Sequence, residues 1–565
     1  MLNWMSDSQS GNNVVDQILR KVDLAGIQDE RARECIRVLL NLIESLTTDL
    51  RKAQAENLYL REQLNRRKGG GGKPGRSKDP SAPASQSSEK ERAEPSETKQ
   101  RTRGSKLDRV RIDREEVLKL DRASLPPDAE FKGYEGVVVQ ELRIGTDNVK
   151  FRKEKYYAAS TGQTYLAPLP AGYRGEFGPH LKSLCLLFSH LCNMTEPKIA
   201  DLLGNMGIVI SNGQISAWLT GAYPELQEEK RAIVEAGLNS SAWQHMDDTG
   251  TRVDGENQHC HIVCNPLYAA YFTTARKDRL TILDVLRNGC PRVFRLNEEA
   301  LVLLRQFGVS QRISERVGQM PFHQDWSQEE LQRRLTEHVG DLAPAARSRI
   351  MEAAALAAYH AESGHVRLLV CDDAKQFKLV ADELALCWVH DGRHYQSMAP
   401  CVPQHREWLD AFRQRYWDFY KQLRAYQQAP TKERPAQLRE QFDELFSTVT
   451  GYDALDQRIA KTKADKMHLL MVLEHPEIPL HNNPAELDVR LRVRKRVVSY
   501  GPRSIAGAQV WDAMETLLST AKKLGVNFFQ YIRDRVSGKR QMPSLADLIK
   551  QRAETLELSS SWAPT

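Results

Sequence analysis

Three acidic points, far apart in the chain, carry the residue types that metal-dependent phosphoryl transfer requires. The preferred residues are Asp247, Asp372 and Glu486, and the acid close to each is its alternative: Asp248, Asp373 and Asp488. Hard divalent cations such as Mg²⁺ or Mn²⁺ prefer carboxylate oxygens, and two ions about 4 Å apart hold both the attacking and the leaving oxygen of an in-line displacement. Taken singly, each acid could be an exposed strand or helix end; together they predict a two-metal catalytic site.

The first two acidic points lie where strands are predicted. The stretch 243–264 indicates two strands joined by a short turn at Asp254-Gly255, and Asp247 lies on the first of them. The apolar run 366–370 predicts a buried strand that ends at Asp372, and 384–390 predicts another short buried strand. Because the carboxyl ends of parallel strands carry ligand-facing residues in α/β sheets, this second position is informative about function.

The third acid, Glu486, lies at the predicted start of a helix. Asn482 or Asn483 can cap that helix, and Pro484 fits just inside its first turn. A basic run follows on the same helix, and we expect it to bind the DNA backbone beside the metals. Its members are Arg490, Arg492, Arg494, Lys495 and Arg496.

A second candidate DNA contact lies upstream, in the helical region 176–239. Thr195-Glu196-Pro197 indicates a helix start, and Ser211 is a possible cap for a shorter helix after a glycine-containing break. This outline is that of a helix-turn-helix, although many helical hairpins share it. The polar positions of the second helix that could reach bases are Asn212, Gln214 and Ser216.

Seam residues recur every seven positions between Ile36 and Leu64. One seam holds Ile36, Ile43, Leu50, Asn57 and Leu64, and the other holds Leu39, Leu46, Ala53 and Leu60. About four heptads favour a coiled coil that joins copies of the chain, with Asn57 fixing the register and the number of partners. The alternative is a single amphipathic helix that folds back on its own chain.

Two segments of contrasting composition lie between this heptad region and the helical region. Residues 68–107 are rich in Gly, Pro, Ser and charge, so we expect a disordered linker that either touches DNA or is a solvated tether. Residues 108–175 combine β-forming runs with turn residues, which indicates a small β-rich module. Its basic and aromatic side chains could grip phosphates or simply form a basic sheet face.

The composition is that of a multidomain protein without membrane spans. At 565 residues the chain is too long for one core, which predicts two to four domains. No run approaches the roughly 18 apolar residues that a membrane helix needs. Nine cysteines without a CxxC pair indicate reduced thiols and a cytoplasmic location. The net charge of +6 permits nucleic acid as a partner without requiring it.

Five stretches resemble the transposase of the insertion sequence 66 family. They are HMDDT, LLVCDDAKQF, CWVHDGRHY, HNNPAELDVRLRVRKR and GAQVWDAMETLLSTAKKLGVNFFQYIRD, within about 240–536. The family pattern is D-E-T, then D-G-Y-x-x-Y followed by C-W-A-H-x-R-R, then D-N-N-x-x-E-R-x-x-R. The matching acids are Asp247, Asp372 and Glu486, and the upstream order of elements also fits.

The resemblance implies a ribonuclease-H-like catalytic core with a DDE triad that cuts transposon ends and joins them to target DNA using magnesium. The expected fold is multidomain α/β, with a mixed sheet flanked by helices and a helical insertion before the last acid. The expected partners are double-stranded DNA, further copies of the chain through the coiled coil, and companion proteins of the same element. The expected location is the bacterial cytoplasm, on the nucleoid when DNA is bound.

The chain is accordingly divided into six regions. They are an N-terminal coiled coil (1–67), a disordered linker (68–107), a β-rich module (108–175), a helix-turn-helix-like DNA-binding region (176–239), a ribonuclease-H-like DDE domain with a helical insertion (240–536) and a C-terminal tail (537–565).

The chain also departs from the family pattern. His481 replaces the family's Asp, Leu487 replaces an Arg, and His394 replaces the second Arg after C-W-A-H. Changes beside a catalytic set can reduce activity without abolishing it. We therefore expect a divergent, active transposase; the alternative is a catalytically silent, transposase-derived DNA-binding protein.

Zinc is not expected as a ligand. Family members usually carry a cysteine-rich zinc module before the helical region, but residues 108–175 contain no cysteine. Cys387 and His390 are three apart, as zinc ligands can be, yet no second pair stands nearby. We expect those two residues to serve packing and contact with a DNA end.

Overall fold

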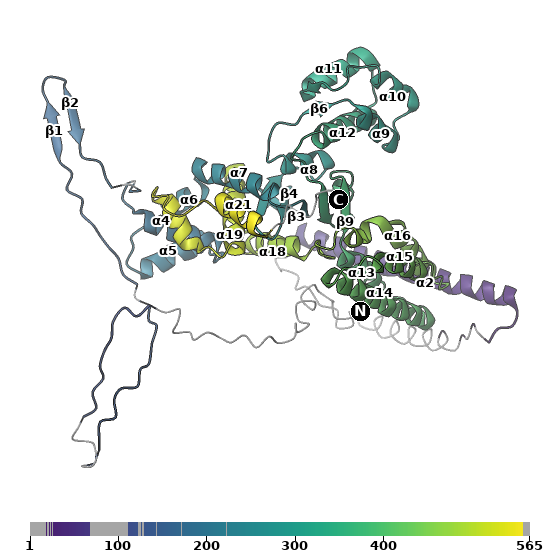
Figure 1. The fold of residues 1–565 in the computed structure, drawn as a ribbon, viewed down its shortest axis with the longest axis horizontal. Helices are drawn as coiled ribbons and strands as arrows, with labels where there is room; N and C mark the ends of the chain where they lie inside the picture. Colours follow the sequence, from purple (N-terminus) through teal and green to yellow (C-terminus); the bar gives the residue numbers. More distant parts are fainter. Residues whose placement is uncertain are drawn as a thin grey trace.

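The computed structural model describes residues 26–67, 111–121, 126, 129–142, 144–170, 172–173, 175–221 and 223–556, together with Leu19, Val22 and Leu24. The expected linker 68–107 and the side chains of 62–67 lie outside the described residues. Figure 1 shows a central sheet flanked by helices, with a group of helices projecting on one side and a thin hairpin extending at one end. None of the described helices is both long enough and apolar enough to cross a membrane.

Five strands form the central sheet. They are β3 (Trp243–Val253), β4 (Glu256–Cys264), β5 (Ala269–Thr274), β8 (Leu368–Cys371) and β9 (Glu383–Leu386). Their order is β5-β4-β3-β8-β9; the first three pair antiparallel, whereas β8 runs parallel to both β3 and β9. This mixed sheet, flanked by helices, is consistent with a ribonuclease-H-like α/β fold.

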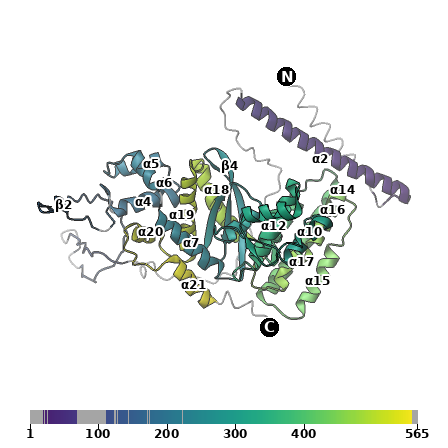
Figure 2. The same cartoon turned by 90° about the horizontal axis from the view of Figure 1, so that it is seen from above.

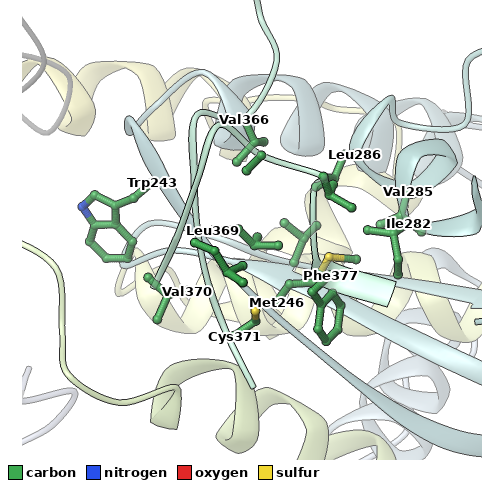
Figure 3. Packing of buried hydrophobic residues seen from close by; sticks show 14 of the residues in the cluster. Trp243, Met246, Ile282, Val285, Leu286, Val366, Leu369, Val370, Cys371 and Phe377 are labelled. Carbon is green, nitrogen blue, oxygen red and sulfur yellow. The ribbon is translucent and has the colours of Figure 1, made fainter. Parts of the chain in front are cut away.

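The hairpin of β3 and β4 forms as the sequence predicts. Asp254 and Gly255 have φ angles of 51° and 80°, the left-handed pair that a two-residue hairpin turn requires. Behind the hairpin, Met246 lies in one buried cluster with Val370 of β8 and with Phe377 (Figure 3). Burying a large apolar side chain of this kind stabilises the fold by about 1.5–3 kcal/mol.

Five helices cover the sheet or pack directly beside it. They are α7 (Pro224–Leu238), α8 (Arg279–Leu286), α12 (Pro344–His360), α18 (Asn483–Ser499) and α19 (Ile505–Lys523). Helix α18 packs along β3 and β4, and α19 packs against β5 and α7. The sheet and α18 therefore determine where the three acids stand.

The chain leaves the sheet twice for long helical excursions. Between β5 and β8, besides α8 and α12, it forms β6 (Phe294–Arg295), α9 (Glu298–Gln306), α10 (Gln311–Val317), β7 (Asp325–Trp326) and α11 (Gln328–Val339). After β8 it forms η3 (Lys375–Phe377), and between β9 and α18 it forms α13 (Trp388–Gln396), α14 (Pro403–Gln428), α15 (Arg434–Leu445), α16 (Asp453–Ala464), α17 (Lys466–Leu469) and η4 (Met471–Leu473). The second excursion is the helical insertion expected before Glu486.

One short strand expected from sequence is wrong in its second half. The run 384–390 reads as a single buried strand, but β9 ends at Leu386 and helix α13 begins at Trp388. The fully buried Trp388 ring packs against Tyr416 and other aromatic rings of the insertion. A short apolar run does not distinguish a strand from a buried helix start.

The region before the sheet contains a hairpin and three packed helices. The elements are β1 (Lys155–Ala158), β2 (Gln163–Leu166), α4 (Pro179–His190), α5 (Glu196–Asn205) and α6 (Asn212–Thr220). Within the described part of 108–175, the hairpin of β1 and β2 supplies the strands, and large apolar side chains such as Leu118 and Val139 are exposed. Helices α4, α5 and α6 pack on one another, and their identity as a helix-turn-helix stays a prediction.

Helix α2 (Glu30–Arg67) is a single long helix that lies apart from the sheet (Figure 2). Its first half folds back on the chain, because Leu40 is buried and Ile43 packs in the same cluster as Val402, just before α14. Further along the helix, residues 48–61 are exposed, including the seam residue Leu50, and so is the seam residue Leu46. The start of the helix thus folds back on its own chain, as in the second interpretation, whereas a coiled coil between copies of the chain stays a prediction.

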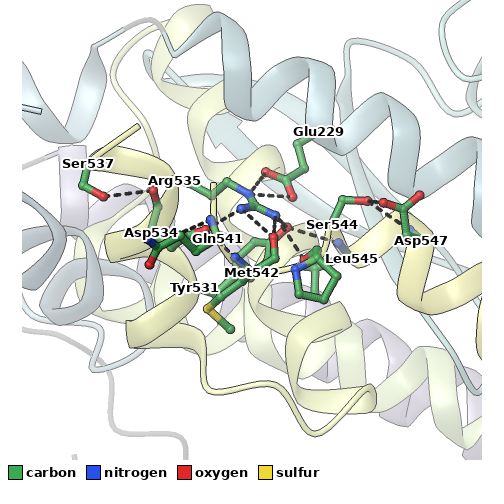
Figure 4. A network of polar contacts seen from close by, with 11 residues as sticks. Glu229, Tyr531, Asp534, Arg535, Ser537, Gln541, Met542, Ser544, Leu545 and Asp547 are labelled. Atoms are coloured by element: carbon green, nitrogen blue, oxygen red, sulfur yellow. Dashed lines mark hydrogen bonds and ion pairs between the residues drawn. The ribbon is translucent and has the colours of Figure 1, made fainter. Parts of the chain in front are cut away.

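The end of the chain forms structure where the sequence analysis expects a tail. Helix α20 (Phe528–Val536) is followed by α21 (Leu545–Leu556), which packs on α7 and fully buries Leu545. Figure 4 shows Arg535 holding this region together. Its Nε lies 3.2 Å from Glu229 Oε2, and its guanidinium donates to the backbone carbonyl of Met542 at 3.2 Å. Residues 557–565 lie outside the described residues.

Candidate functional site

Asp247 lies on β3, and Asp372 directly follows the adjacent parallel strand β8. His245 of β3 is the register partner of Val370 of β8. Asp247 is two residues after His245, and Asp372 is two residues after Val370. The pairing of the two strands therefore brings the two carboxylates to the same level of the sheet. Backbone amides fix both: Asp247 Oδ1 accepts from the next residue at 2.8 Å, and Asp372 Oδ1 accepts from Ala374 N at 3.1 Å.

The third acid is positioned by Asn482, which is completely buried at the start of α18. Its side-chain Nδ2 donates to Met246 O at 2.8 Å, and its Oδ1 lies 2.8 Å from His245 Nδ1. Its backbone N–H donates to the thiol of Cys387 at 3.2 Å. Asn482 is the residue before the helix, as expected, but its side chain ties the helix to β3 and makes no cap hydrogen bond. Glu486, one turn later, is thereby held beside the strand acids.

Glu486 contacts two basic side chains of α13. Nη2 of Arg393 donates to both carboxylate oxygens of Glu486 at 3.1 Å, and His390 Nε2 lies 3.4 Å from Oε1. Only 11% of the Glu486 side chain is exposed, so solvent screens these charge contacts less than it screens contacts on the surface. The segment expected to contact a DNA end therefore contacts the third acid.

Each alternative acid is held by lysine. Lys277 Nζ lies 3.3 Å from Asp248, which also accepts from Gln376 at 2.7 Å. Lys523 Nζ lies 3.1 Å from Asp488. For Asp373 the partners are Lys378 at 2.6 Å and Lys461 at 3.1 Å. The neighbours of Asp247, Asp372 and Glu486 are thus already neutralised by cations of the protein.

The electrostatics of the preferred acids differ from those of exposed carboxylates. Burial raises the pKa of Asp247 to about 7, and the charges of Asp372, Asp248 and Glu486 add to this rise. Burial also raises the pKa of Asp372. Burial lowers the pKa of His390, although the negative charge of Glu486 opposes that shift. Carboxylates crowded in this way resist ionisation until a cation offsets their charge.

These three side chains fit the chemistry of hard divalent cations, because all the donors are carboxylate oxygens. Among the described residues, no three His, Cys, Asp or Glu side chains already stand as a complete metal-ligand set. Glu486 is turned toward Arg393 and His390 instead. For it to join the strand acids around a cation, the Arg393 contact has to be exchanged for the metal.

The basic run of α18 divides between the interior and the surface. Arg492 and Lys495 are buried, so the expectation that they contact DNA is corrected. The guanidinium of Arg492 binds Asp512 and, at 2.6 Å, Glu515 of α19. Of the other three residues in the run, Arg494 is exposed, whereas Arg490 and Arg496 are half-buried.

The predicted base-contacting residues lie on α6. Ser211 caps this helix as expected, accepting from Gln214 N at 3.1 Å. Asn212 is exposed, while the side chains of Gln214 and Ser216 are half-buried. Their contact with bases stays a prediction.

Sequence reasoning missed several residues that shape the site. The contact of Arg393 with Glu486 and the link from Asn482 to β3 join segments far apart in the chain. Both residues lie in stretches that carry the family resemblance, and this was the sequence signal that could have identified them. Lys277 and Lys461 carry no local signal, because each lies in an ordinary polar segment.

The fold and the positions of the three acids together indicate a fold class. A mixed sheet flanked by helices, with acids on β3, directly after β8 and on α18, is consistent with a ribonuclease-H-like α/β fold. The family model described as "Transposase IS66 family" matches residues 345–510, which include Asp372 and Glu486 but begin after Asp247. Over 325 residues the chain is 32% identical to "Uncharacterized protein y4jO" of Sinorhizobium fredii (strain NBRC 101917 / NGR234).

That alignment covers 57% of this chain and 100% of the Sinorhizobium protein. No solved structure matches the chain. On the family model and this relative, the chain belongs to the IS66 family of transposases. Membership supports a transposase role and an enzyme that acts on DNA, in a family class that generally uses divalent metal ions.

Proposed function

We propose that this chain binds the ends of an insertion sequence and catalyses metal-dependent DNA strand cleavage and strand transfer. One observation carries the proposal: Asp247 and Asp372 follow the same parallel register, and Asn482 fixes the helix start that presents Glu486 beside them. The acids next to these three are held by lysines and are not available in the same way.

In this proposal Asp247, Asp372 and Glu486 hold two Mg²⁺ or Mn²⁺ ions. When bound, such ions act as Lewis acids and orient the attacking and leaving oxygens of the displacement. The chain's own contribution is to place three carboxylates on rigid elements and to exclude water from one side of them. Arg393, once Glu486 turns away from it, can bind a phosphate oxygen of the DNA strand.

DNA contacts are proposed on two surfaces. Near the acids, Lys277, Lys378 and Lys461 line the site, and Arg494 is exposed on α18. Upstream, the bases of the element ends would contact side chains of α6. The proposed contact residues are Asn212, Gln214 and Ser216. Phosphate contacts would set the position of the duplex, and base contacts would give sequence preference.

Partners and location follow from the same proposal. The exposed half of α2, which includes Leu46, Leu50 and Leu60, is the surface through which copies of the chain would associate. Companion proteins encoded by the same element, and action on the bacterial chromosome in the cytoplasm, belong to this proposal too. Replacing Leu46 and Leu50 by Lys should reduce the molar mass measured by light scattering to that of a monomer.

The proposal is tested by excision and integration of a marked mini-element in bacterial cells. The element carries its native ends and companion genes, and wild type is compared with Glu486→Gln. Loss of a metal-binding carboxylate should lower mobilisation by on the order of 10³-fold or more. The matched control is Asp488→Asn on the same helix, where Lys523 already holds the acid; it should stay within about tenfold of wild type.

A second candidate function is a DNA-binding protein without catalysis. The contact of Arg393 with both carboxylate oxygens of Glu486 favours it, since an acid that stays paired does not bind metal. The same experiment separates the two functions. If wild type and Glu486→Gln both bind the ends and neither mobilises the element, the catalytic proposal fails.

A further inference from the structure

A cavity of about 470 Å³ lies within the first helical excursion, and none of the three acids lines it. Its walls come from the loop after β5, from α8 and β6, and from α11 and α12. Figure 1 shows these helices beside α8, on the side where they leave the sheet. The volume falls within the range of small-molecule sites in proteins.

Three arginines line this cavity: Arg276, Arg292 and Arg347. No acidic residue lines it. Arg292 is neutralised by Asp284, with its Nε and Nη2 at 3.0 and 2.6 Å from the carboxylate oxygens. Within the described part of the chain, Arg276 and Arg347 make no ion pair. The cavity wall therefore has an excess of two positive charges.

Arg347 supplies the strongest sign of a ligand. Its Nε is buried, yet it has no hydrogen-bond partner among the described residues. A buried donor without a partner costs about 1–3 kcal/mol, and more when it is charged. A phosphate oxygen in the cavity would remove this cost, because guanidinium groups bind phosphate with strong, directed hydrogen bonds.

The rest of the lining suits the remainder of a nucleotide. Gln328 and Gln332 stand one turn apart on α11, and their amides can both donate and accept hydrogen bonds. Leu280, Phe294 and Met351 provide an apolar wall. Amide groups beside an apolar surface are what a purine or pyrimidine ring requires.

We propose that this cavity binds one nucleotide unit, with its phosphate on Arg276 and Arg347 and its base between the glutamines and the apolar wall. The unit can come from a free nucleoside monophosphate or from an unstacked nucleotide of a DNA strand. The second source rests on the proposed function, and the position of Arg276 favours it.

Arg276 connects the cavity to the acids. Its backbone carbonyl lies 3.2 Å from Nε2 of His261, which is the register partner of Asp248. The next residue, Lys277, reaches the carboxylate of Asp248 at 3.3 Å. A DNA strand leaving the acids along Lys277 would therefore meet the rim of the cavity.

The test uses the full-length protein, two probes and three variants. The probes are deoxyadenosine monophosphate, followed by calorimetry, and a duplex with a single-stranded tail that contains 2-aminopurine, followed by fluorescence. Arg347→Ala removes the orphaned donor, and Ser348→Phe fills the cavity while keeping every arginine. Arg349→Ala, at an exposed position of the same helix, is the charge-matched control.

For the monophosphate, both cavity variants should weaken binding at least about tenfold, while the control changes it less than about twofold. For the tail, both should lose the fluorescence change on binding. Loss of either signal in both variants supports the proposal, and the probe that responds identifies the source of the nucleotide.

Two results would overturn it. One is that neither probe distinguishes the cavity variants from Arg349→Ala. The other is that inorganic phosphate competes as well as the monophosphate, which would make the cavity a plain anion site. Glu486→Gln should bind the monophosphate like wild type, so failure of the catalytic proposal and failure of this one are told apart.

Discussion

Helix α18 contacts two charged centres that are built in opposite ways. At its start, three carboxylates gather around Asp247 with Arg393 and His390 as their basic neighbours, in a place that solvent still reaches. Two turns later, Arg492 is completely buried and binds both Asp512 and Glu515. The acid centre has surplus negative charge and is partly open to solvent, whereas the charged groups of the arginine centre are paired with one another and buried.

Under the proposed function, the acid centre serves catalysis, whereas the arginine centre serves the stability of the fold. A buried charge that is paired inside the protein is not available to a ligand. Removing its partner leaves that charge unpaired in a low-dielectric interior, which is costly. A centre with unmatched charge gains most from a ligand of opposite sign. Each of the following substitutions perturbs one centre and should leave the other intact.

The largest effect is expected from Asp372→Asn in the acid centre. Removing one carboxylate should lower mobilisation of the mini-element by on the order of 10³-fold, because a neutral amide binds a divalent cation poorly. Asp373→Asn, at the adjacent residue paired with Lys378 and Lys461, should stay within about tenfold. Equal losses in the two variants would contradict the assignment of Asp372.

In the arginine centre, Arg492→Met should lower the free energy of unfolding by about 3–5 kcal/mol, since Asp512 and Glu515 are left buried without their partner. Denaturant titration followed by circular dichroism measures this. Arg494→Met, on the exposed side of the same helix, should change stability by no more than about 0.5 kcal/mol. A small effect at Arg492 would mean that the centre is not the anchor of α18.

Asn482 links the acid centre to the fold, and Asn482→Ala should affect both stability and activity. Loss of the bonds to Met246 O and His245 Nδ1 should cost about 1–3 kcal/mol of unfolding free energy. Mobilisation should fall by about 10–100-fold, because Glu486 is no longer held in place. Unchanged activity in a destabilised variant would show that Asn482 does not position Glu486.

The smallest effect is a pH dependence from Lys495, a buried amine that is affected by the charges of Glu515 and Arg492 in the arginine centre. Burial lowers the pKa of Lys495 to about 7, whereas in the unfolded chain this amine keeps its proton up to roughly pH 10. Between these values the unfolded state binds more protons, so the free energy of unfolding rises with pH, by at most about 1.4 kcal/mol per unit.

Lys495→Met should abolish this rise. Unfolding free energies of wild type and variant, measured at pH 7, 8 and 8.5, should therefore differ most at pH 7 and converge as the pH increases. Curves that run parallel over this range would show that Lys495 keeps its proton in the folded protein.

Much of the acid centre could be predicted from the sequence because local signals place it. The turn at Asp254-Gly255, the apolar run before Asp372 and the Asn-Pro helix start each act over a few residues, and each element forms where expected. The arginine centre could not be predicted. Its acids come from α19, some twenty residues later, and the basic run of α18 reads as a surface until those partners are known.

The remaining differences have similar causes. Residues 384–390 change from strand to helix because Trp388 has an aromatic pocket that the later insertion supplies. The segment after Val536 packs on α7 through Leu545, a contact between distant parts of the chain. In both cases a long-range contact decides what a short sequence window leaves open.

The order in which the chain is synthesised determines when its acid centre is complete. Asp247 and Asp372 emerge from the ribosome well before α18, and the hydrogen bonds of Asn482 that hold Glu486 form only after α18 has been synthesised. Protein segments fold from the N-terminus during synthesis. A nascent chain therefore carries Asp247 and Asp372 before Glu486, and the acid centre is complete only once α18 has been synthesised.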